Sequence, residues 1–186
     1  MYNFKRQFIK LIFIAYVFFS CFFMSYYKVV FAQEEPLRID IMGGKIQAMP
    51  IAISYFTIED DLKELKLHNN IPNLIADNLV NSGLFKLLNR DAYMQNPEQL
   101  GRSPKFRDWR IIDAQALITG NISKRADNKI NVSIKLWDVY GEKRLFGISL
   151  SSKIKSWRRI SHIISDKIYE RLTGEEGYFD TRIIYV

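Results

Sequence analysis

The sequence has very few of the residues that bind metals or form disulfides. Its 186 residues include one cysteine, Cys21, and two histidines, His68 and His162. A lone thiol cannot form an intramolecular disulfide, and zinc sites draw their ligands from clusters of cysteine and histidine at short spacings. These absences exclude a disulfide-stabilised fold and a cysteine–histidine metal site, so we expect no metal and no other cofactor.

Catalytic motifs are missing as well. No serine lies in a Gly-x-Ser-x-Gly motif, and the double glycine at residues 43–45 lacks the spacing and the Lys-Ser/Thr ending of a phosphate-binding loop. Three adjacent acidic residues at 59–61 lie in a very polar stretch, whereas paired carboxylates that do acid–base work need one member in an apolar pocket. We therefore expect no enzymatic activity and no small-molecule substrate. A hydrolase would require a pocket that groups His162 with acidic residues.

Residues 1–32 have the three-part layout of a secretory signal peptide. Basic residues precede an apolar run over residues 11–24, and Val30 and Ala32 take the −3 and −1 positions of a cleavage site. The pattern predicts export and cleavage after Ala32, so that the mature chain begins at Gln33.

Two alternatives remain open for this leader. The first is a retained membrane anchor, because an apolar run near this length approaches the roughly 20 residues that span a bilayer. The second is lipidation of Cys21, although residues 18–20 (Phe-Phe-Ser) lack the leucine and the small residue of a lipoprotein box.

Removal of the leader changes the charge balance. The whole chain has 27 Lys and Arg against 20 Asp and Glu, a formal charge of +7. Residues 1–32 hold four of the basic residues and no acidic ones, so the other 154 residues carry 23 against 20, or +3. A balance this close to neutral gives no support to nucleic-acid binding. A chain of 154 residues is about the size of one domain that its core alone can stabilise.

The first part of the mature chain has the pattern of strands. "LRIDI" at 37–41 alternates apolar and polar residues, residues 43–45 predict a turn, and "AMPIAIS" at 48–54 is a second apolar strand, which together predict a hairpin. Because proline donates no ladder hydrogen bond, Pro50 should lie at a strand start or an edge. Residues 57–68 are polar and indicate a surface loop or a short helix.

A helix follows, and then a strand. We expect Asn69 or Asn70 as the N-cap of the helix, Pro72 in its first turn and Gly83 as its left-handed stop. The apolar residues between these limits recur on one helical face. A strand is predicted over residues 84–90.

The second half of the chain is predicted to contain a loop, three strands and a last helix. The loop covers residues 91–113, with a short helix around 106–111. A strand follows at 114–123, and the alternating runs 129–139 and 144–150 predict an antiparallel hairpin.

The last helix carries apolar residues at three- and four-residue steps, between Ser156 as its cap and Gly174 as its stop. The order of elements predicts an α/β (α+β) fold, with a mixed, mostly antiparallel sheet and two helices packed on one face.

Four stretches of the mature chain carry a resemblance to a known family. In order, they are "LRIDI" with "PIAI" shortly after it, "IADNLVNSGLFKLLNR", "ALITGNI" leading into "NVSIKLWDVYG", and "ISDKIYERLTGEEGYFDTRIIYV". Together they resemble the amino-terminal domain of the TolB family, which belongs to the Tol-Pal system of the periplasm. In the last stretch, a helix ending in L-T-G, an acidic spacer and the pattern G-x-F-x-T-R-I-x-Y-V resemble the family's passage from its small domain into a β-propeller.

The resemblance implies a division of the chain into three parts. Residues 1–32 would be the signal peptide, residues 33–176 the TolB-like α/β domain, and residues 177–186 the start of a six-bladed β-propeller. The sequence stops as the first propeller strand begins, so we expect either an interrupted gene or a fragment. Because "TRIIYV" is apolar and would lack its partner strands, we also expect aggregation through it.

The resemblance also implies protein partners. In this family the mature amino terminus is a flexible arm that engages the carboxy-terminal domain of TolA. By position, the arm here would consist of Gln33, Glu34, Glu35, Pro36, Leu37, Arg38 and Ile39. An extended arm can add to a sheet edge of the partner, with Leu37 and Ile39 giving the register. Residues 33–36 depart from the family pattern by their added acidic length.

The function implied by the resemblance is that of a non-enzymatic periplasmic adaptor. It would link inner-membrane TolA to the outer-membrane side, for envelope integrity and for constriction during cell division. Peptidoglycan-associated lipoprotein binds mainly through the propeller in this family, so we expect it as a partner only if the propeller is supplied separately. The alternative is a free-standing periplasmic or lipoprotein-like regulator of envelope synthesis with the same small fold, which a lipid on Cys21 would favour.

Overall fold

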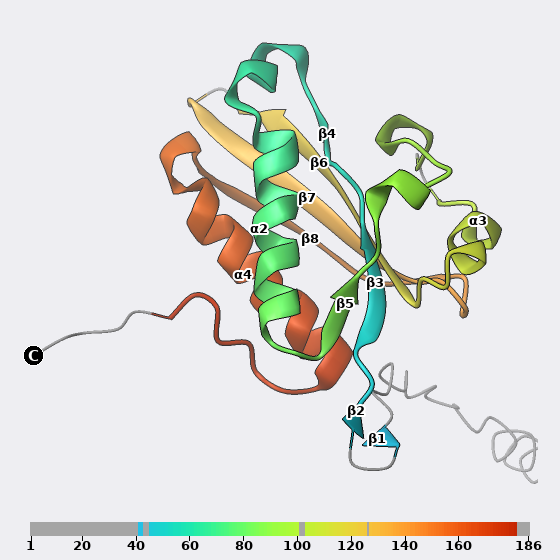
Figure 1. Ribbon diagram of the computed structural model, residues 1–186. Helices are drawn as coiled ribbons and strands as arrows, with labels where there is room; N and C mark the ends of the chain where they lie inside the picture. Colours follow the sequence, from blue (N-terminus) through green and yellow to red (C-terminus); the bar gives the residue numbers. More distant parts are fainter. Residues whose placement is uncertain (1–40, 43–44, 101–102, 126, 182–186) are drawn as a thin grey trace, which may run out of the picture. The chain divides into compact units, whose positions relative to one another are not determined.

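The computed structural model describes residues 41–42, 45–100, 103–125 and 127–181. Its centre is a six-stranded sheet in the order β5-β3-β6-β7-β8, with β4 paired to β6 (Figure 1). The strands are β3 Met49–Ile53, β4 Thr57–Ile58, β5 Phe85–Leu87, β6 Ala116–Lys124, β7 Lys129–Asp138 and β8 Lys143–Lys153. A two-stranded sheet is formed by β1 Ile41–Met42 and β2 Lys45–Ile46.

The large sheet is mixed, and most of its length is antiparallel. β6, β7 and β8 form a long antiparallel meander, whereas β3 runs parallel to β5 and to β6, and β4 runs parallel to β6. The alternating sequence of β7 explains the meander, because Ile130, Val132 and Leu136 are fully buried on one face. The predicted fold class is therefore confirmed.

The strands of the first predicted hairpin pair differently from the prediction. We expected strand 48–54 to pair with strand 37–41, but β1 pairs with β2, and β3 lies between β5 and β6. Apolar residues occupy both faces of β3, since Ile51, Ala52 and Ile53 are all fully buried. A strand buried on both faces is typical of a parallel sheet, whose faces are both covered.

Pro50 lies at the start of β3, as predicted for a residue without a backbone N–H. Its carbonyl accepts a 2.9 Å hydrogen bond from the N–H of Gln115. The ladder between β3 and β6 begins one residue later, with Ile51 opposite Ala116. The proline therefore precedes this ladder and does not interrupt it.

Two helices cover one face of the sheet, as predicted. α2 (Leu67–Asn81) and α4 (Trp157–Thr173) lie side by side over it (Figure 1). Their apolar residues join the inward side chains of the sheet in one core, which includes Ile71, Ile75, Leu79, Ile160, Ile164, Ile168 and Leu172. Each large apolar side chain that is fully buried contributes about 1.5–3 kcal/mol relative to exposure, so this core is a main source of stability.

The start of α2 differs from its prediction. The helix begins at Leu67 with Lys66 at its N-cap, so the expected cap at Asn69 or Asn70 is wrong. Lys66 adopts the left-handed conformation with φ 52° and ends the preceding 3-10 turn, which carries the chain directly into the helix. The predicted stop is confirmed, because Gly83 follows the helix with φ 78°.

Pro72 consequently lies inside α2, where it frees a backbone carbonyl. Without a proline N–H, the carbonyl of His68 has no helical partner four residues later. The N–H of Phe56 donates to that carbonyl at 3.1 Å. The ring of Phe56 lies against Gly120 of β6, where an added Cβ would come within 2.6 Å of the ring. The proline thus makes one helical carbonyl available for a tertiary contact.

The connection between β5 and β6 covers the opposite face of the sheet. It contains η2 (Arg90–Ala92), η3 (Pro97–Leu100) and α3 (Phe106–Ile111), the last with the predicted bounds. Figure 1 shows α3 on the side of the sheet away from α2 and α4. A second core lies beneath it and comprises Ala52, Leu100, Trp109, Ala114, Leu117, Trp137 and Val139. The sequence predicted the short helix but not that this loop closes a face.

The other elements are short turns at the ends of strands and helices. Of the two predictions for residues 57–68, a surface loop or a short helix, η1 (Asp60–Leu65) corresponds to the short helix, and η4 (Ile154–Ser156) leads into α4. α4 begins after Ser156 and ends at Gly174 with φ 80°, as predicted. Within the described ranges, no helix combines the length and the apolar composition needed to cross a bilayer.

Candidate functional site

The functional predictions concern the two ends of the domain. The arm predicted to bind TolA, Gln33 to Ile39, lies outside the described residues, so this interface stays a prediction. The stretch predicted to lead into a propeller, residues 177–186, is described as far as Thr181. The site that can be built from the structure is therefore the exit segment, residues 177–180, and the face of α4 that it contacts.

Asp166 of α4 holds the exit segment by its backbone. One carboxylate oxygen accepts a 2.7 Å hydrogen bond from the N–H of Phe179, and the other accepts a 3.1 Å bond from the N–H of Asp180. Two turns earlier on α4, Arg159 forms an ion pair with Asp180 at 3.3 Å. Hydrogen bonds to an ionised carboxylate are stronger than those between neutral groups. One helix face therefore fixes two consecutive residues after the helix has ended.

Aromatic contacts add to these polar ones. The ring of Tyr169 on α4 lies 5.8 Å from that of Phe179 and 5.6 Å from that of Tyr178, both edge to face. On its other side, Tyr169 contacts Phe85 of β5 at 6.2 Å. Edge-to-face pairs at these distances are favourable, so the exit segment is joined through Tyr169 to the main core.

Gly177 allows this close approach. A Cβ at this position would lie 2.4 Å from the Cα of Asp166, a distance that only displacement of the backbone could relieve. Glycine is the residue that permits backbone to pack this tightly. Sequence reasoning missed the contact with α4, and the pattern G-x-F after the helix was the one available sign of it.

The acidic run considered for catalysis is engaged in surface contacts. Asp60 pairs with Lys63 at 2.6 Å, and Asp61 pairs with Lys124 at 2.8 Å. The carboxylate of Glu59 accepts a 2.9 Å bond from the backbone N–H of Lys124. The hydrogen bond from Lys63, together with its charge, lowers the pKa of Asp60. These residues tie η1 to the end of β6, and their carboxylates lie in solvent-exposed positions.

The second histidine lies at the contact between the two large helices. The side-chain N–H of Asn78 on α2 donates to Nδ1 of His162 at 3.0 Å and to Oγ of Ser165 at 2.9 Å, both on α4. This arrangement joins the helices. Across the described part of the chain, no group of three or more His, Cys, Asp and Glu side chains could hold a metal ion.

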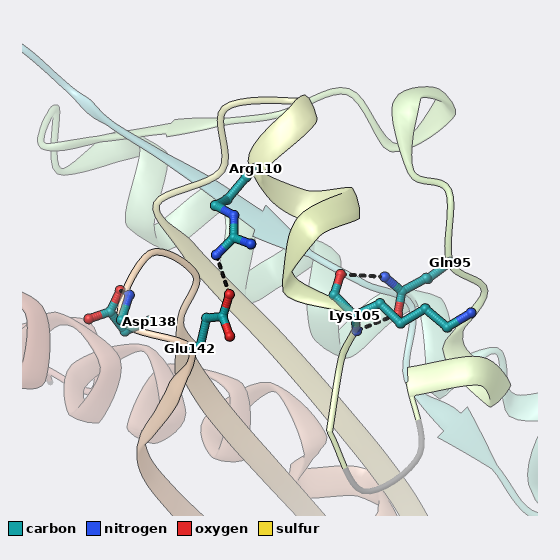
Figure 2. A network of polar contacts seen from close by, with 6 residues as sticks. Gln95, Lys105, Arg110, Asp138 and Glu142 are labelled. Atoms are coloured by element: carbon teal, nitrogen blue, oxygen red, sulfur yellow. Dashed lines mark hydrogen bonds and ion pairs between the residues drawn. The ribbon is translucent and has the colours of Figure 1, made fainter.

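A polar network anchors the loop that carries α3 (Figure 2). The buried amide of Gln95 donates to the carbonyl of Lys105 at 2.9 Å and accepts from its N–H at 3.0 Å. Arg110 of α3 forms an ion pair with Glu142 in the turn between β7 and β8. In the same turn, Asp138 accepts a 2.8 Å bond from the N–H of Gly141. Of these contacts, the Arg110–Glu142 pair joins the loop to the sheet, whereas the Gln95 bonds lie within the loop and the Asp138 bond lies within the connection between β7 and β8.

Comparisons with known proteins identify relatives of the chain. A family model described as the TolB amino-terminal domain matches residues 37–145. The Tol-Pal system protein TolB of Pelagibacter ubique is 41% identical over 158 residues, which cover 81% of this chain and 35% of that protein. The Tol-Pal system protein TolB of Paramagnetospirillum magneticum is 38% identical over 168 residues, which cover 90% of this chain and 37% of that protein. The chain thus spans about a third of the length of the curated relatives it matches.

A solved structure shows the same fold. TolB from Acinetobacter baumannii superposes with a TM-score of 0.58 at 26% sequence identity, over 72% of this chain and 30% of that chain. The fold described above is therefore similar to one part of a larger protein.

Proposed function

The chain belongs to the family of TolB amino-terminal domains, and from this membership we propose that it is a non-enzymatic periplasmic adaptor of the Tol-Pal system. In this proposal it links TolA of the inner membrane to the outer-membrane side, for envelope integrity and for constriction during cell division. The observation that carries the proposal is the match over residues 37–145, with 41% and 38% identity to two Tol-Pal proteins.

The predicted arm precedes the described elements. Residues 33–39 come before β1, which begins at Ile41, and Met49 is the first of the described residues in the main core. We therefore expect deletion of the arm to leave the two described cores intact. Binding through such an arm can be lost while the fold is kept, which makes the proposal testable.

The experiment is capture of the purified TolA carboxy-terminal domain by the exported chain. We expect deletion of Gln33 to Ile39 to abolish capture while the far-UV circular dichroism spectrum stays unchanged. A second variant replaces the same seven residues with glycine and serine, which keeps the length of the arm but removes the apolar side chains of Leu37 and Ile39. We expect this variant to lose capture as well. Capture that persists in both variants would remove the arm from the proposal.

The last ten residues of the sequence, which include the exit segment, belong to the same proposal. We take residues 177–186 as the passage into the propeller that the TolB resemblance implies, since the curated relatives are about three times as long as the matched region. Peptidoglycan-associated lipoprotein would then require the propeller. We expect no capture of this lipoprotein by the chain alone, and capture by the chain alone would contradict this division of roles.

The proposed location is the periplasm, reached by export and cleavage after Ala32. Intact mass spectrometry of the protein recovered from the periplasm tests it directly. We expect a mature chain that begins at Gln33. A retained leader or a lipid-sized mass increase on Cys21 would instead favour an anchored form.

A further inference from the structure

β8 forms one edge of the large sheet. Among the described strands it pairs with β7 alone, and its eleven residues make it the longest strand of the sheet. The opposite edge strand, β5, has three residues. From Phe146 to Lys153 the register with β7 is regular. A long regular edge offers backbone N–H and C=O groups to an added strand.

Two hollows meet on this edge at Gly147. The first, of about 520 Å³, lies on the face away from α2 and α4, and its lining includes Ser133, Lys135, Arg144 and Ser149. The second, of about 610 Å³, lies between β8 and α4. Gly147 lines both hollows. Successive side chains of a strand point to opposite faces, so a strand added along β8 would direct them alternately into the two hollows.

The first hollow carries two positive charges side by side. A Cβ on Gly147 would lie 3.9 Å from Cγ of Lys135 and 4.0 Å from Cδ of Arg144, so both side chains flank this glycine. A bulge explains the pairing, because Arg144 pairs with Trp137 while Phe146 pairs with Leu136, which leaves Leu145 as the extra residue. The bulge turns Arg144 onto the face that bears Lys135.

Neither cation of this pair forms an ion pair among the described residues. Lys135 lies over the ring of Trp137, with its Nζ 5.8 Å from the ring centroid, and this contact leaves its charge in place. The rest of the lining is mixed and includes one acidic residue, Glu98, as well as Ser133 and Ser149, which are hydrogen-bonded to each other at 2.9 Å. With two cations against one carboxylate, this surface favours an acidic side chain.

The second hollow favours an apolar side chain. Phe146 and Ile148 line it and are partly buried against the main core. Lys167 and Glu170 of α4, also in its lining, are paired with each other at 2.7 Å. Arg171 also lines this rim, so the rim carries no excess of acidic charge, and the apolar area beneath it is available for contact.

A second copy of β8 is a poor occupant of this edge. In an antiparallel pair centred on Ile148, Lys143 of one copy would lie opposite Lys153 of the other, at both ends of the pair. Like charges directly opposite each other are destabilising. In this register the charges of the edge disfavour self-pairing, whereas they would attract an acidic strand.

We propose that the β8 edge binds an extended segment of a partner protein in which acidic and apolar residues alternate. The backbone of the segment extends the sheet, its acidic side chains lie beside Lys135 and Arg144, and its apolar side chains lie over Phe146 and Ile148. This surface is distinct from the amino-terminal arm. In the proposed function the arm is the added strand, whereas here β8 receives one.

The test measures binding of a labelled peptide to the full exported chain by fluorescence anisotropy. The probe is a blocked peptide of about eight residues that alternates valine and glutamate. We expect saturable binding at low salt that weakens as the salt concentration rises. The double variant Lys135→Glu/Arg144→Glu should weaken binding by about tenfold or more, because it replaces attraction by repulsion at two positions.

A matched variant controls for net charge. Lys86 and Arg107 are exposed and lie outside both hollows, so Lys86→Glu/Arg107→Glu makes the same change of charge elsewhere and should bind the probe as the unaltered chain does. A peptide that alternates valine and lysine should bind the Lys135→Glu/Arg144→Glu variant better than the unaltered chain. This exchange of preference cannot come from misfolding.

Four outcomes would overturn the proposal. The first three concern the peptide assay: the valine–glutamate probe shows no saturable binding, both double variants weaken binding equally, or the valine–lysine peptide does not prefer the Lys135→Glu/Arg144→Glu variant. The fourth is a concentration-dependent dimer in sedimentation that the Lys135→Glu/Arg144→Glu variant abolishes. The assay contains no TolA, so its failure leaves the proposed adaptor function untouched.

Discussion

At the scale of single residues, Asp166 determines where the chain goes after α4. Its two carboxylate oxygens accept hydrogen bonds from the backbone N–H groups of Phe179 and Asp180. These two bonds hold the backbone of the exit segment against the helix. The sequence offers little sign of this role, because an acidic residue in the middle of an amphipathic helix usually faces solvent. The role of Asp166 follows from the three-dimensional structure, in which the chain at Gly177 packs closely against the Cα of Asp166.

Replacing Asp166 by alanine should lower the free energy of unfolding by about 1.5–3 kcal/mol, because two backbone N–H groups lose an ionised acceptor. Asp166→Asn keeps one acceptor oxygen and should lose less. Urea unfolding measures both, and limited proteolysis should show earlier cleavage after α4 in Asp166→Ala. An unchanged urea midpoint for Asp166→Ala would mean that the clamp adds nothing to stability.

Tyr93 makes stability depend on pH in the alkaline range. Its hydroxyl accepts a 3.1 Å bond from the N–H of Ile53 and donates to the carbonyl of Leu88 at 3.2 Å. Burial raises the pKa of Tyr93 above its usual 10.0. Because the folded pKa exceeds the unfolded one, the neutral form favours folding, and this contribution is complete below pH 10 and is lost as the pH rises towards the folded pKa.

Because phenylalanine does not titrate, the Tyr93→Phe variant should lose less free energy of unfolding than the unaltered chain as the pH rises above 10. At neutral pH the variant should be about 1–3 kcal/mol less stable, since Ile53 and Leu88 each lose a hydrogen-bond partner in the interior. Chemical unfolding at pH 7 and at several points from pH 9 to 11 measures both effects. Some alkaline loss should remain, because burial also contributes to a raised pKa for Tyr169. Identical alkaline profiles in the two proteins would contradict the assignment.

At the scale of elements, the connection between β5 and β6 acts as a cover. Trp109 of α3 is 1% exposed, lies 4.9 Å from the ring of Tyr93, and belongs to the second core with Leu117 and Trp137. Gln95 braces the loop internally by bonding to Lys105, and the Arg110–Glu142 pair joins α3 to the turn between β7 and β8. The segment therefore closes a face of the sheet that would otherwise expose Trp137.

Trp109→Ala should lower the free energy of unfolding by about 3–5 kcal/mol, because it leaves a cavity beneath the cover. Ile111, in the same helix, is 61% exposed, so Ile111→Ala should change stability by less than about 0.5 kcal/mol. Thermal unfolding of the two variants provides the comparison. Equal and small effects would show that α3 lies on the sheet without stabilising it.

Local sequence patterns predicted most helices and strands, but they did not predict which strands pair over long distances in the sequence. The alternation in residues 129–139 fixed one face of β7, and Gly83 and Gly174 marked the helix ends, because these features depend on neighbouring residues alone. The partners of β3 depend on residues 85–87 and 116–118, far along the chain. A turn signal at residues 43–45 was therefore not sufficient to choose between a hairpin and a parallel sheet.

The candidate site was less predictable than the fold. The N-cap of α2 was misplaced because Lys66, in a left-handed conformation, carries η1 directly into the helix, whereas the prediction assumed an asparagine cap with an extended backbone. The contact of the exit segment with α4 depends on the missing side chain of Gly177, where a Cβ would lie 2.4 Å from the Cα of Asp166, and no periodicity encodes this. The family resemblance placed functional residues at 33–39, and these lie outside the described ranges.

At the scale of the whole molecule, the carboxy-terminal residues affect two properties, stability and solubility, through different parts of their sequence. Residues 177–180 belong to the small domain through Asp166 and Tyr169. Beyond Thr181, the sequence "RIIYV" is apolar and β-branched, a composition that favours intermolecular strand pairing. Stability and solubility should therefore respond to different truncations.

A chain that ends after Thr181 should keep its thermal midpoint and gain solubility, because it retains the clamp and loses the apolar residues. A chain that ends after Glu176 should melt about 5–10 °C lower, since it also loses the Asp166 hydrogen bonds and the contact between Tyr169 and Phe179. Differential scanning calorimetry and static light scattering measure the two properties on the same samples. If the two truncated chains melt together, the exit segment adds nothing to the domain. If the longer one scatters as much light as the full chain, the apolar residues beyond Thr181 are not the source of association.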